Sequence, residues 1–231
     1  MLIGKKINTC TVGLDKCTCF ESLKAEELDL INRNLVEVEF KKGETICKQG
    51  TFATHVMYLS KGLTKVFMEG QQETLVLKII PEDNLIGLTA LFNETNVFQY
   101  SVAAYVDSLV KLINIDVFRQ VLAQNAKFAS EIINILNANT VQTYGRFYCL
   151  TQKQAYGRLA DIILCLADRI YKEKEFELLL SRKDFAELSG MTTENVIRML
   201  KKFKDDKLIK IEGKKFKILK YDKLQEISNY G

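Results

Sequence analysis

Residues 178–219 read LLLSRKDFAELSGMTTENVIRMLKKFKDDKLIKIEGKKFKIL, and this stretch decides the fold of the C-terminal part of the chain. Ser181, with Asp184 three positions later, has the pattern of a capping box and predicts the start of a helix. Gly190 predicts the end of this helix, because glycine readily adopts the left-handed conformation of a tight turn. Thr192 then caps a second helix. Two short helices joined by such a turn are typical of a helix-turn-helix.

The second predicted helix, from Thr192 to about Asp205, has one apolar and one polar face. Its apolar residues recur at helical spacing and are expected to face the core: Val196, Met199, Leu200 and Phe203. The opposite face combines a short acceptor, an aliphatic side chain and charged groups: Thr193, Glu194, Ile197, Arg198, Lys201 and Lys202. This mixture suits DNA recognition, because the first residues of such a helix reach base edges while basic residues hold phosphates.

Arg198 is the predicted base-reading residue of this helix. Arginine bridges O6 and N7 of guanine, glutamate accepts from N4 of cytosine, and an aliphatic side chain such as that of Ile197 suits contact with a thymine methyl group. Glu194 and Arg198 are four residues apart, so the alternative is that they only pair with each other on a solvated face.

A β-hairpin is expected after the two helices. The alternating segments LIKIE and KFKIL flank a short turn at Gly213. A helix-turn-helix followed by a hairpin is a winged helix, with Lys214 and Lys215 at the tip of the wing. The sequence therefore predicts binding to double-stranded DNA through these residues: Ser181, Arg182, Thr192, Thr193, Glu194, Asn195, Ile197, Arg198, Lys201, Lys202, Lys214 and Lys215.

Charge is distributed unevenly along the 231 residues. The net charge is +4, but residues 1–150 carry 15 basic and 16 acidic side chains, whereas residues 151–231 carry 18 and 13. A basic C-terminal third is expected of a region that binds a phosphate backbone. A solvated lysine-rich face is the alternative.

Composition and motifs narrow the class of protein. The sequence is 47% hydrophobic but has no run of eighteen apolar residues, and its start, MLIGKKINTC, lacks the apolar stretch of a secretory signal. We therefore expect a cytoplasmic protein that does not contact a membrane. The glycine-rich phosphate loop, HExxH and GxSxG motifs are absent and there is a single histidine, so we do not expect an enzyme.

The histidine and the cysteines are expected to have structural roles. His55 precedes a predicted strand, which favours a surface or packing role over ligation of haem or zinc. A chain of this length does not need disulfide staples, so its six cysteines are expected as free thiols. Cys149 and Cys165 fall on predicted helices among apolar residues and are expected in the core.

The N-terminal half has the sequence pattern of β-structure. Residues 20–34 predict a helix, and from Val36 onward β-prone segments recur at roughly ten-residue spacing with glycine turns between them. These segments are VEVEF, KKGETICKQG, MYLSKGLTKVFMEG, ETLVLKII, NLIGLTALF, YSVAAYV and SLVKLINI. The pattern predicts an antiparallel roll or sandwich.

A long amphipathic helix is predicted from Asp116 onward, because neither glycine nor proline occurs before Gly145. A long helix between two globular parts commonly packs against its copy in a dimer. The alternative is that it packs only on its own β-domain. The predicted dimer interface consists of two apolar stripes and the polar residue that continues them: Phe128, Ile132, Ile133, Ile135, Leu136 and Asn139.

The Glu194-x-x-x-Arg198 pattern in SRKDFAELSGMTTENVIRMLKKFK, with the glycine framework of KKGETICKQG, MYLSKGLTKV and NLIGLTALF, resembles the Crp/Fnr family of bacterial transcription regulators. The resemblance implies an α+β fold: a cysteine-bearing tail (1–19), a β-roll sensor domain of the cyclic-nucleotide-binding jelly-roll type (20–115), a dimerisation helix (116–150) and a winged helix-turn-helix DNA-binding domain (151–231). It also implies a homodimer on a near-palindromic operator, and contact with RNA polymerase if the protein is an activator.

The resemblance places an effector pocket in the roll, at Leu88, Thr89, Tyr100 and Ser101. Members that bind cyclic nucleotides carry a Glu where Leu88 stands and an Arg-Ser pair where Tyr100-Ser101 stands. A buried phosphate needs a cation or several N–H donors, and Tyr100 supplies no charge. We therefore expect that cyclic AMP does not bind and that another effector, or a redox signal, controls the protein.

Oxygen-sensing members of the family hold a [4Fe–4S] cluster with N-terminal cysteines and one cysteine of the roll. Here Cys10, Cys17 and Cys19 have the spacing C-x6-C-x-C, and Lys111 stands where the fourth cysteine is expected. Cys47 is the candidate substitute. Because an all-cysteine cluster needs four thiolates, we expect a tail without metal. An iron–sulfur redox or oxygen sensor that uses these cysteines is the alternative.

Overall fold

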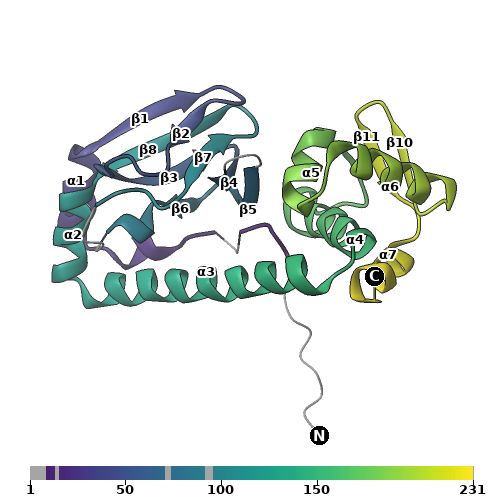
Figure 1. Cartoon of the computed structure of the whole chain (residues 1–231). Helices are drawn as coiled ribbons and strands as arrows, with labels where there is room; N and C mark the ends of the chain where they lie inside the picture. The colour runs from purple at the N-terminus through teal and green to yellow at the C-terminus, as the bar shows by residue number, and fades with distance from the viewer. Residues whose placement is uncertain (1–8, 14–15, 71–73, 92–95, 231) are drawn as a thin grey trace, which may run out of the picture. The chain divides into compact units, whose positions relative to one another are not determined.

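The computed structural model describes residues 9–13, 16–70, 74–91 and 96–230 (Figure 1). Contacts within the chain divide it into two compact units. The first, here called the β-roll unit, contains Gly13–Thr74 and Ile79–Thr140. The second, here called the C-terminal unit, contains Val141–Gly231 with residues 9–12 and Leu75–Lys78. Both units combine helices with strands, which confirms the predicted α+β class.

Two four-stranded sheets form the β-roll. The first has the order β1 (Leu35–Phe40), β8 (Ser108–Asn114), β3 (His55–Lys61) and β6 (Asn84–Ile86). The second has the order β2 (Thr45–Cys47), β7 (Ser101–Ala104), β4 (Leu63–Glu69) and β5 (Thr74–Pro81). The pairs β1–β8, β3–β8, β3–β6, β2–β7 and β4–β7 are antiparallel, as predicted. Val56 and Val110 of the first sheet and Val66 and Val102 of the second are almost completely buried, so both sheets supply the core.

A glycine is required where β3 turns into β4. Gly62 has a φ of 112°, and a Cβ at this position would lie 2.8 Å from the Cα of Ser108. Only a residue without a side chain fits both the backbone conformation and the space. This glycine belongs to the framework on which the family resemblance rests.

Helices flank the roll: a 3-10 turn at Cys19–Ser22, α1 (Ala25–Arg33), a second 3-10 turn at Leu88–Ala90, α2 (Ile115–Gln124) and the first part of α3 (Ala126–Gln152). The prediction of one helix from Asp116 is wrong, because the helix breaks at Asn125. The Oδ1 atom of Asn125 accepts a hydrogen bond from the backbone N of Phe128 at 3.0 Å, and its Nδ2 donates to Oε2 of Glu27 at 2.7 Å. Asparagine is a favoured helix cap, so α3 starts anew after it.

The C-terminal unit is a winged helix with additional helices. It contains the end of α3, α4 (Ala155–Cys165), a π-helical turn (Leu166–Tyr171), β9 (Glu175–Glu177), α5 (Arg182–Ser189), α6 (Thr193–Asp205), β10 (Ile209–Glu212), β11 (Lys215–Ile218) and α7 (Tyr221–Tyr230). The three strands form a sheet in the order β10-β11-β9. The predicted helix-turn-helix and hairpin are confirmed to within one or two residues. In the described part of the chain, no helix is both long enough and apolar enough to cross a membrane.

Candidate functional site

The helix-turn-helix begins with the predicted capping box. The backbone N of Ser181 donates to Oδ2 of Asp184 at 2.7 Å, and the backbone N of Asp184 donates to the Ser181 hydroxyl at 3.2 Å. Gly190 ends α5 with a φ of 60°, and the hydroxyl of Thr192 accepts from the backbone N of Asn195 at 3.3 Å. These local hydrogen bonds set the start of α6.

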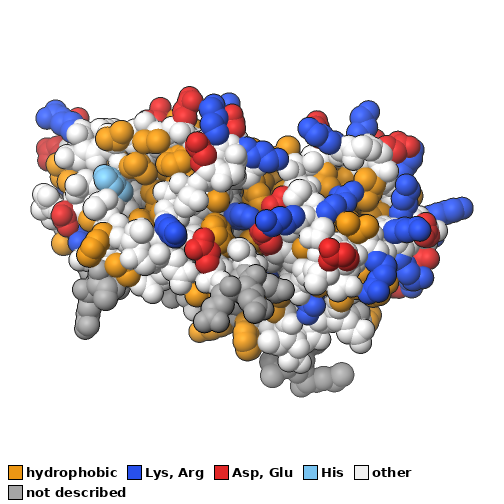
Figure 2. Space-filling view, turned by 45° about the horizontal axis from the view of Figure 1, so that its top comes forward, with side chains coloured by type: hydrophobic (Ala, Val, Ile, Leu, Met, Phe, Trp, Pro, Cys, Tyr) orange, Lys and Arg blue, Asp and Glu red, His pale blue; other side chains and the backbone are white. Residues whose placement is uncertain are grey.

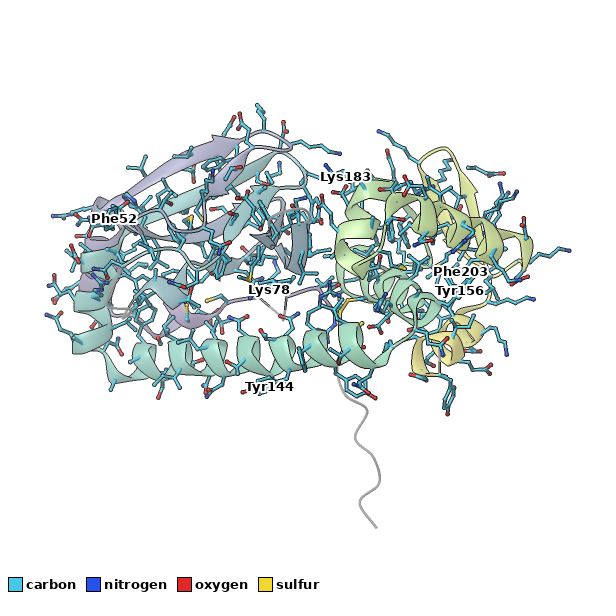
Figure 3. The ribbon with its side chains drawn as sticks, viewed as in Figure 1. Phe52, Lys78, Tyr144, Tyr156, Lys183 and Phe203 are labelled. Carbon is cyan, nitrogen blue, oxygen red and sulfur yellow. A yellow bond between two sulfur atoms is a disulfide. The ribbon has the colours of Figure 1, made fainter. Side chains whose placement is uncertain are left out.

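One face of α6 is held in the core of the C-terminal unit. The four apolar residues predicted to face inward are at most 6% exposed: Val196, Met199, Leu200 and Phe203. The rings of Phe203 and Tyr156 of α4 lie 5.8 Å apart between centroids, and Figure 3 shows the two labelled side chains together. The opposite face of α6 is thereby directed to solvent, and its exposed residues are Glu194, Ile197, Arg198, Lys201 and Lys202.

Arg198 lies in the middle of this exposed face. Its Nη2 atom donates to Oδ1 of Asn195 at 2.9 Å, so its partner is an amide one turn back and not the carboxylate of Glu194. Glu194 lies at the start of α6, where its own backbone N–H and the Thr192 hydroxyl lower the pKa of its carboxyl group. Glu194 is therefore an ionised hydrogen-bond acceptor at neutral pH.

Ile197 is an aliphatic residue among these polar groups, and 51% of it is exposed. Water contact with an apolar side chain costs free energy that burial against another apolar group removes. A thymine methyl in the major groove is such a group. Lys201 and Lys202 follow one turn later, and Lys202 lies 3.6 Å from Asp206 in an exposed pair.

The wing carries the predicted lysines at its tip. Gly213 supplies a φ of 60° at the turn between β10 and β11, directly before Lys214 and Lys215, which are both exposed. Lys214 lies 3.7 Å from Glu177 of β9, and an exposed pair of this kind is weak enough to be exchanged for a phosphate. Figure 2 shows many Lys and Arg side chains over the surface of the C-terminal unit.

Ser181 and Arg182, two of the predicted DNA contacts, lie at the start of α5. The Ser181 hydroxyl donates to Oδ2 of Asp184 at 2.7 Å and serves as the cap of α5. Arg182 is half-buried, and burial lowers the pKa of its guanidinium. Ser181 therefore has a structural role at the start of α5, and Arg182 is less exposed than the cations of α6.

The predicted effector pocket of the roll is occupied by its own side chains. The backbone N of Gly87 donates to the Tyr100 hydroxyl at 3.1 Å, and the Thr89 side chain hydrogen-bonds the same hydroxyl. Burial raises the pKa of Tyr100. The Ser101 hydroxyl is completely buried and accepts from the backbone N of Gln49 at 3.0 Å. The polar groups of these predicted pocket residues are therefore already paired, and Leu88 is buried and apolar.

The cysteines do not gather into a cluster. Cys10 forms a disulfide with Cys165, which corrects the expectation of free thiols for these two residues. Cys165 is buried in the core, as expected. Cys17 and Cys19 hydrogen-bond each other, which lowers the pKa of Cys17 and raises that of Cys19. Cys47 is buried in β2, and burial raises its pKa to about 12. Among the residues described, no three His, Cys, Asp or Glu side chains are placed to hold a metal ion, so this arrangement does not fit a four-thiolate cluster.

His55 and Cys149 are held by local contacts. Nδ1 of His55 lies 2.8 Å from the Thr54 hydroxyl. Cys149 is buried in α3, as expected, and its Sγ lies 3.6 Å from Oδ2 of Asp161. Neither residue is placed as part of a reactive pair.

The two stripes of the long helix have different environments. Phe128 and Ile132 are buried in the β-roll unit, where the ring of Phe128 lies 5.3 Å from that of Phe118. These two residues therefore pack on the β-domain of their own chain, which is the alternative to a dimer contact. Other positions on α3 expose large apolar side chains: Ile133, Val141, Tyr144, Phe147 and Tyr148. Tyr144 projects outward from the helix in Figure 3. Ile135, Leu136 and Asn139 are half-buried.

Comparisons with known proteins match both units. Residues 37–125 match the model of the cyclic nucleotide-binding domain, and residues 157–227 match that of the Crp-like helix-turn-helix domain. The chain is 25% identical over 222 residues to electron transport regulator A of Shewanella oneidensis, with 93% of this chain and 87% of that protein covered. It is 20% identical over 232 residues to the fumarate and nitrate reduction regulatory protein of Vibrio cholerae, with 95% and 91% covered.

A solved structure has the same fold. FixK2 from Bradyrhizobium japonicum superposes with a TM-score of 0.75 at 16% identity, covering 84% of this chain and 96% of that one. The helix-turn-helix match contains α5, α6 and the wing, and the cyclic nucleotide-binding match contains most strands of the roll.

Proposed function

We propose, since the chain belongs to the Crp/Fnr family of transcription regulators, that two copies bind a near-palindromic DNA operator through α6 and the β10–β11 wing. The observation that carries this proposal is the exposed face of α6. Ile197 and Arg198 lie at its centre and Lys201 and Lys202 at its far end, above a buried face that fixes the helix.

The residues of this face have different roles in the proposal. Arg198 reads a guanine and Ile197 contacts a thymine methyl, because both lie in the first half of α6, where a recognition helix reaches base edges. Lys201, Lys202 and the wing lysines hold phosphates. Lys214 and Lys215 do so from the tip of the hairpin.

The second copy packs against α3. Tyr144 and Phe147 are 68% and 69% exposed and lie on the same side of the helix as Val141 and Tyr148, at steps of three and four residues. Large apolar side chains at this spacing form the seam of a helix pair. Phe128 and Ile132 are excluded from the interface because they are buried in the β-roll unit.

The β-roll is the controlling part in this proposal. Its signal is not cyclic AMP, because a phosphate needs hydrogen-bond donors and the backbone N–H groups of Gly87 and Gln49 already donate to Tyr100 and Ser101. The protein acts on DNA in the cytoplasm without a catalytic step, and contacts RNA polymerase if it activates transcription. Its operator sets the two recognition helices in successive major grooves.

The test is fluorescence anisotropy of the purified chain on labelled duplex DNA of random sequence and on a selected operator. Affinity for both should fall linearly with the logarithm of salt concentration, because lysine and arginine displace condensed counterions. Absence of binding at low salt, or an affinity that does not depend on salt, contradicts the proposal. Lys223→Ala is the matched control for lysine variants of the DNA-binding surface. Lys223 lies on α7 and pairs with Glu226 at 2.6 Å, so its loss should leave the affinity for DNA unchanged.

A further inference from the structure

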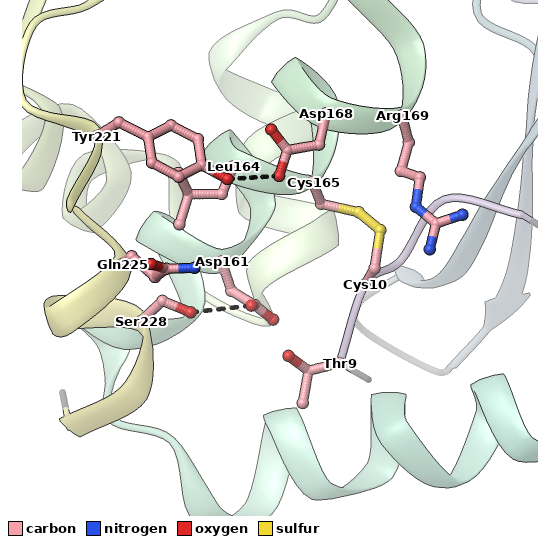
Figure 4. A pocket seen from close by; sticks show the side chains of 10 residues that line it. All are labelled: Thr9, Cys10, Asp161, Leu164, Cys165, Asp168, Arg169, Tyr221, Gln225 and Ser228. Carbon is pink, nitrogen blue, oxygen red and sulfur yellow. Dashed lines mark hydrogen bonds between the residues drawn. A yellow bond between two sulfur atoms is a disulfide. The ribbon is translucent and has the colours of Figure 1, made fainter. Parts of the chain in front are cut away.

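A pocket of about 300 Å³ lies in the C-terminal unit, and the Cys10–Cys165 disulfide forms part of its wall. Residues of the N-terminal segment, α4, the π-helical turn and α7 line it (Figure 4). Cys165 is the last residue of α4, directly before the π-helical turn, and Cys10 is half-buried. We propose that this pocket admits a low-molecular-mass thiol with a carboxylate group, which reduces the disulfide and thereby weakens DNA binding.

The disulfide is reachable from the pocket, and the other cysteine of the C-terminal unit, Cys149, is a poor attacking group. Burial raises the pKa of Cys149 to about 11, so this thiol is protonated at neutral pH, whereas thiolate is the attacking species. Disulfides in proteins of a reducing compartment are commonly transient, since cellular thiols reduce those they can reach. A small thiol that enters the pocket is therefore the expected partner.

The polar lining of the pocket selects the kind of thiol. Asp161 is paired with Lys153 at 3.0 Å and accepts from Ser228 at 2.9 Å, and Asp168 accepts from the Tyr221 hydroxyl at 2.7 Å. Arg169 lines the same pocket as the disulfide. Its guanidinium has five N–H donors, more than one partner uses, and it binds carboxylates well.

The exchange consists of two substitutions at sulfur. A thiolate attacks Sγ of Cys10, forms a mixed disulfide and breaks the Cys10–Cys165 bond, whose electron pair moves to Sγ of Cys165 and takes a proton from water. A second thiolate attacks the external sulfur of the mixed disulfide, and Cys10 leaves with the electron pair and is protonated. Two small thiols become one small disulfide, and the protein disulfide becomes two thiols.

The N-terminal segment, residues 9–12, is bound to both helices at the junction between α3 and α4, and the disulfide is its covalent link to α4. The Nε2 atom of Gln142 donates to the backbone O of Cys10 at 3.2 Å and to that of Val12, and Nζ of Lys153 donates to the Thr9 hydroxyl at 3.1 Å. The disulfide then ties the same segment to α4. Reduction leaves only the hydrogen bonds, so the junction that carries the winged helix gains conformational freedom.

Greater freedom at this junction weakens DNA binding, because a dimer must hold two recognition helices at one spacing. We expect the oxidised chain to bind an operator roughly tenfold more tightly than the reduced chain, within the usual range of coupling between two sites. This part of the inference rests on the proposed DNA binding. The thiol exchange does not, and is measured separately.

The exchange is tested on the oxidised full chain with cysteine and, in parallel, with 2-mercaptoethanol. Reduction is followed by alkylation of new thiols and mass spectrometry. Arg169→Gln should slow reduction by cysteine several-fold and leave reduction by 2-mercaptoethanol unchanged, whereas Lys172→Gln, outside the pocket, should change neither. Equal effects of Arg169→Gln on both thiols, or a disulfide that cysteine does not reduce, overturns the inference.

The regulatory part is tested by operator affinity with and without cysteine. Cys10→Ser and Cys165→Ser should bind as the reduced chain does in both conditions, and Cys47→Ser, in the β-roll unit, should keep the full response. Equal affinity of oxidised and reduced chains overturns the regulatory part alone. Absence of DNA binding in both states contradicts the proposed function instead and leaves the thiol exchange measurable.

Discussion

Arg198 Nη2 lies 2.9 Å from Oδ1 of Asn195, one turn back on the exposed face of α6. The amide holds the guanidinium without neutralising its charge, in contrast to a pair with Glu194. A side chain that is already restricted loses less conformational entropy when it binds. The contact therefore prepares Arg198 to meet a base edge.

Arg198→Ala should cost about 1–3 kcal/mol of binding free energy and relax the preference for one base pair in each half-site. The reason is the loss of a bidentate contact to guanine. Binding is measured on duplexes that differ from the operator at single base pairs. If Arg198 only made a solvated surface pair, the variant would lose about 0.3–0.5 kcal/mol and keep the same preferences.

Lys201→Ala should weaken binding to all sequences about equally. It should lower the slope of log affinity against log salt by about one unit, the value for one lost phosphate contact. The measurement is anisotropy at several salt concentrations on operator and random DNA. A selective loss on the operator, with an unchanged salt slope, would assign Lys201 to base recognition instead.

Phe147→Lys should convert the protein to monomers at micromolar concentration while the monomer stays folded. Phe147 is 69% exposed, so the substitution removes a contact with the second copy and none with the core. Sedimentation measures the mass of the particle, and thermal unfolding shows whether the variant stays folded. Phe128→Ala should instead destabilise the fold, with a loss of about 3–5 kcal/mol in the free energy of unfolding, because Phe128 is buried. A parent chain that sediments as a monomer contradicts the interface.

Cyclic AMP should produce no heat of binding in calorimetry with the parent chain. Tyr100→Phe removes the hydroxyl that accepts from the backbone N of Gly87, and should cost about 0.5–1.5 kcal/mol of stability without creating affinity for cyclic AMP. Saturable binding to the parent at micromolar nucleotide would show that the pocket rearranges around a phosphate.

The winged helix could be predicted almost to the residue, because its signals are local. Ser181 with Asp184, Gly190 and Thr192 each determine the conformation of neighbouring residues, so no long-range information is needed. The β-roll could be predicted as a class for a similar reason, since alternation and glycine turns are short-range patterns.

Features that depend on distant parts of the chain could not be predicted. Cys10 and Cys165 are 155 positions apart, and nothing near either residue indicates the other. Two apolar stripes run along the long helix, and periodicity does not say that Phe128 and Ile132 belong to the inner one. The break at Asn125 also needs contacts with Ser22 and Glu27, a hundred residues earlier.

The central claim is that a dimer of this chain reads a near-palindromic DNA site with α6. Selection of bound sites from a random duplex library by the unmodified, oxidised protein tests it most directly. The account predicts two inverted half-sites with centres about 10 base pairs apart, one turn of the double helix, so that each copy of α6 enters a major groove on the same side of the DNA. Bound sequences with no enriched motif, or with a single half-site and no inverted partner, would contradict it.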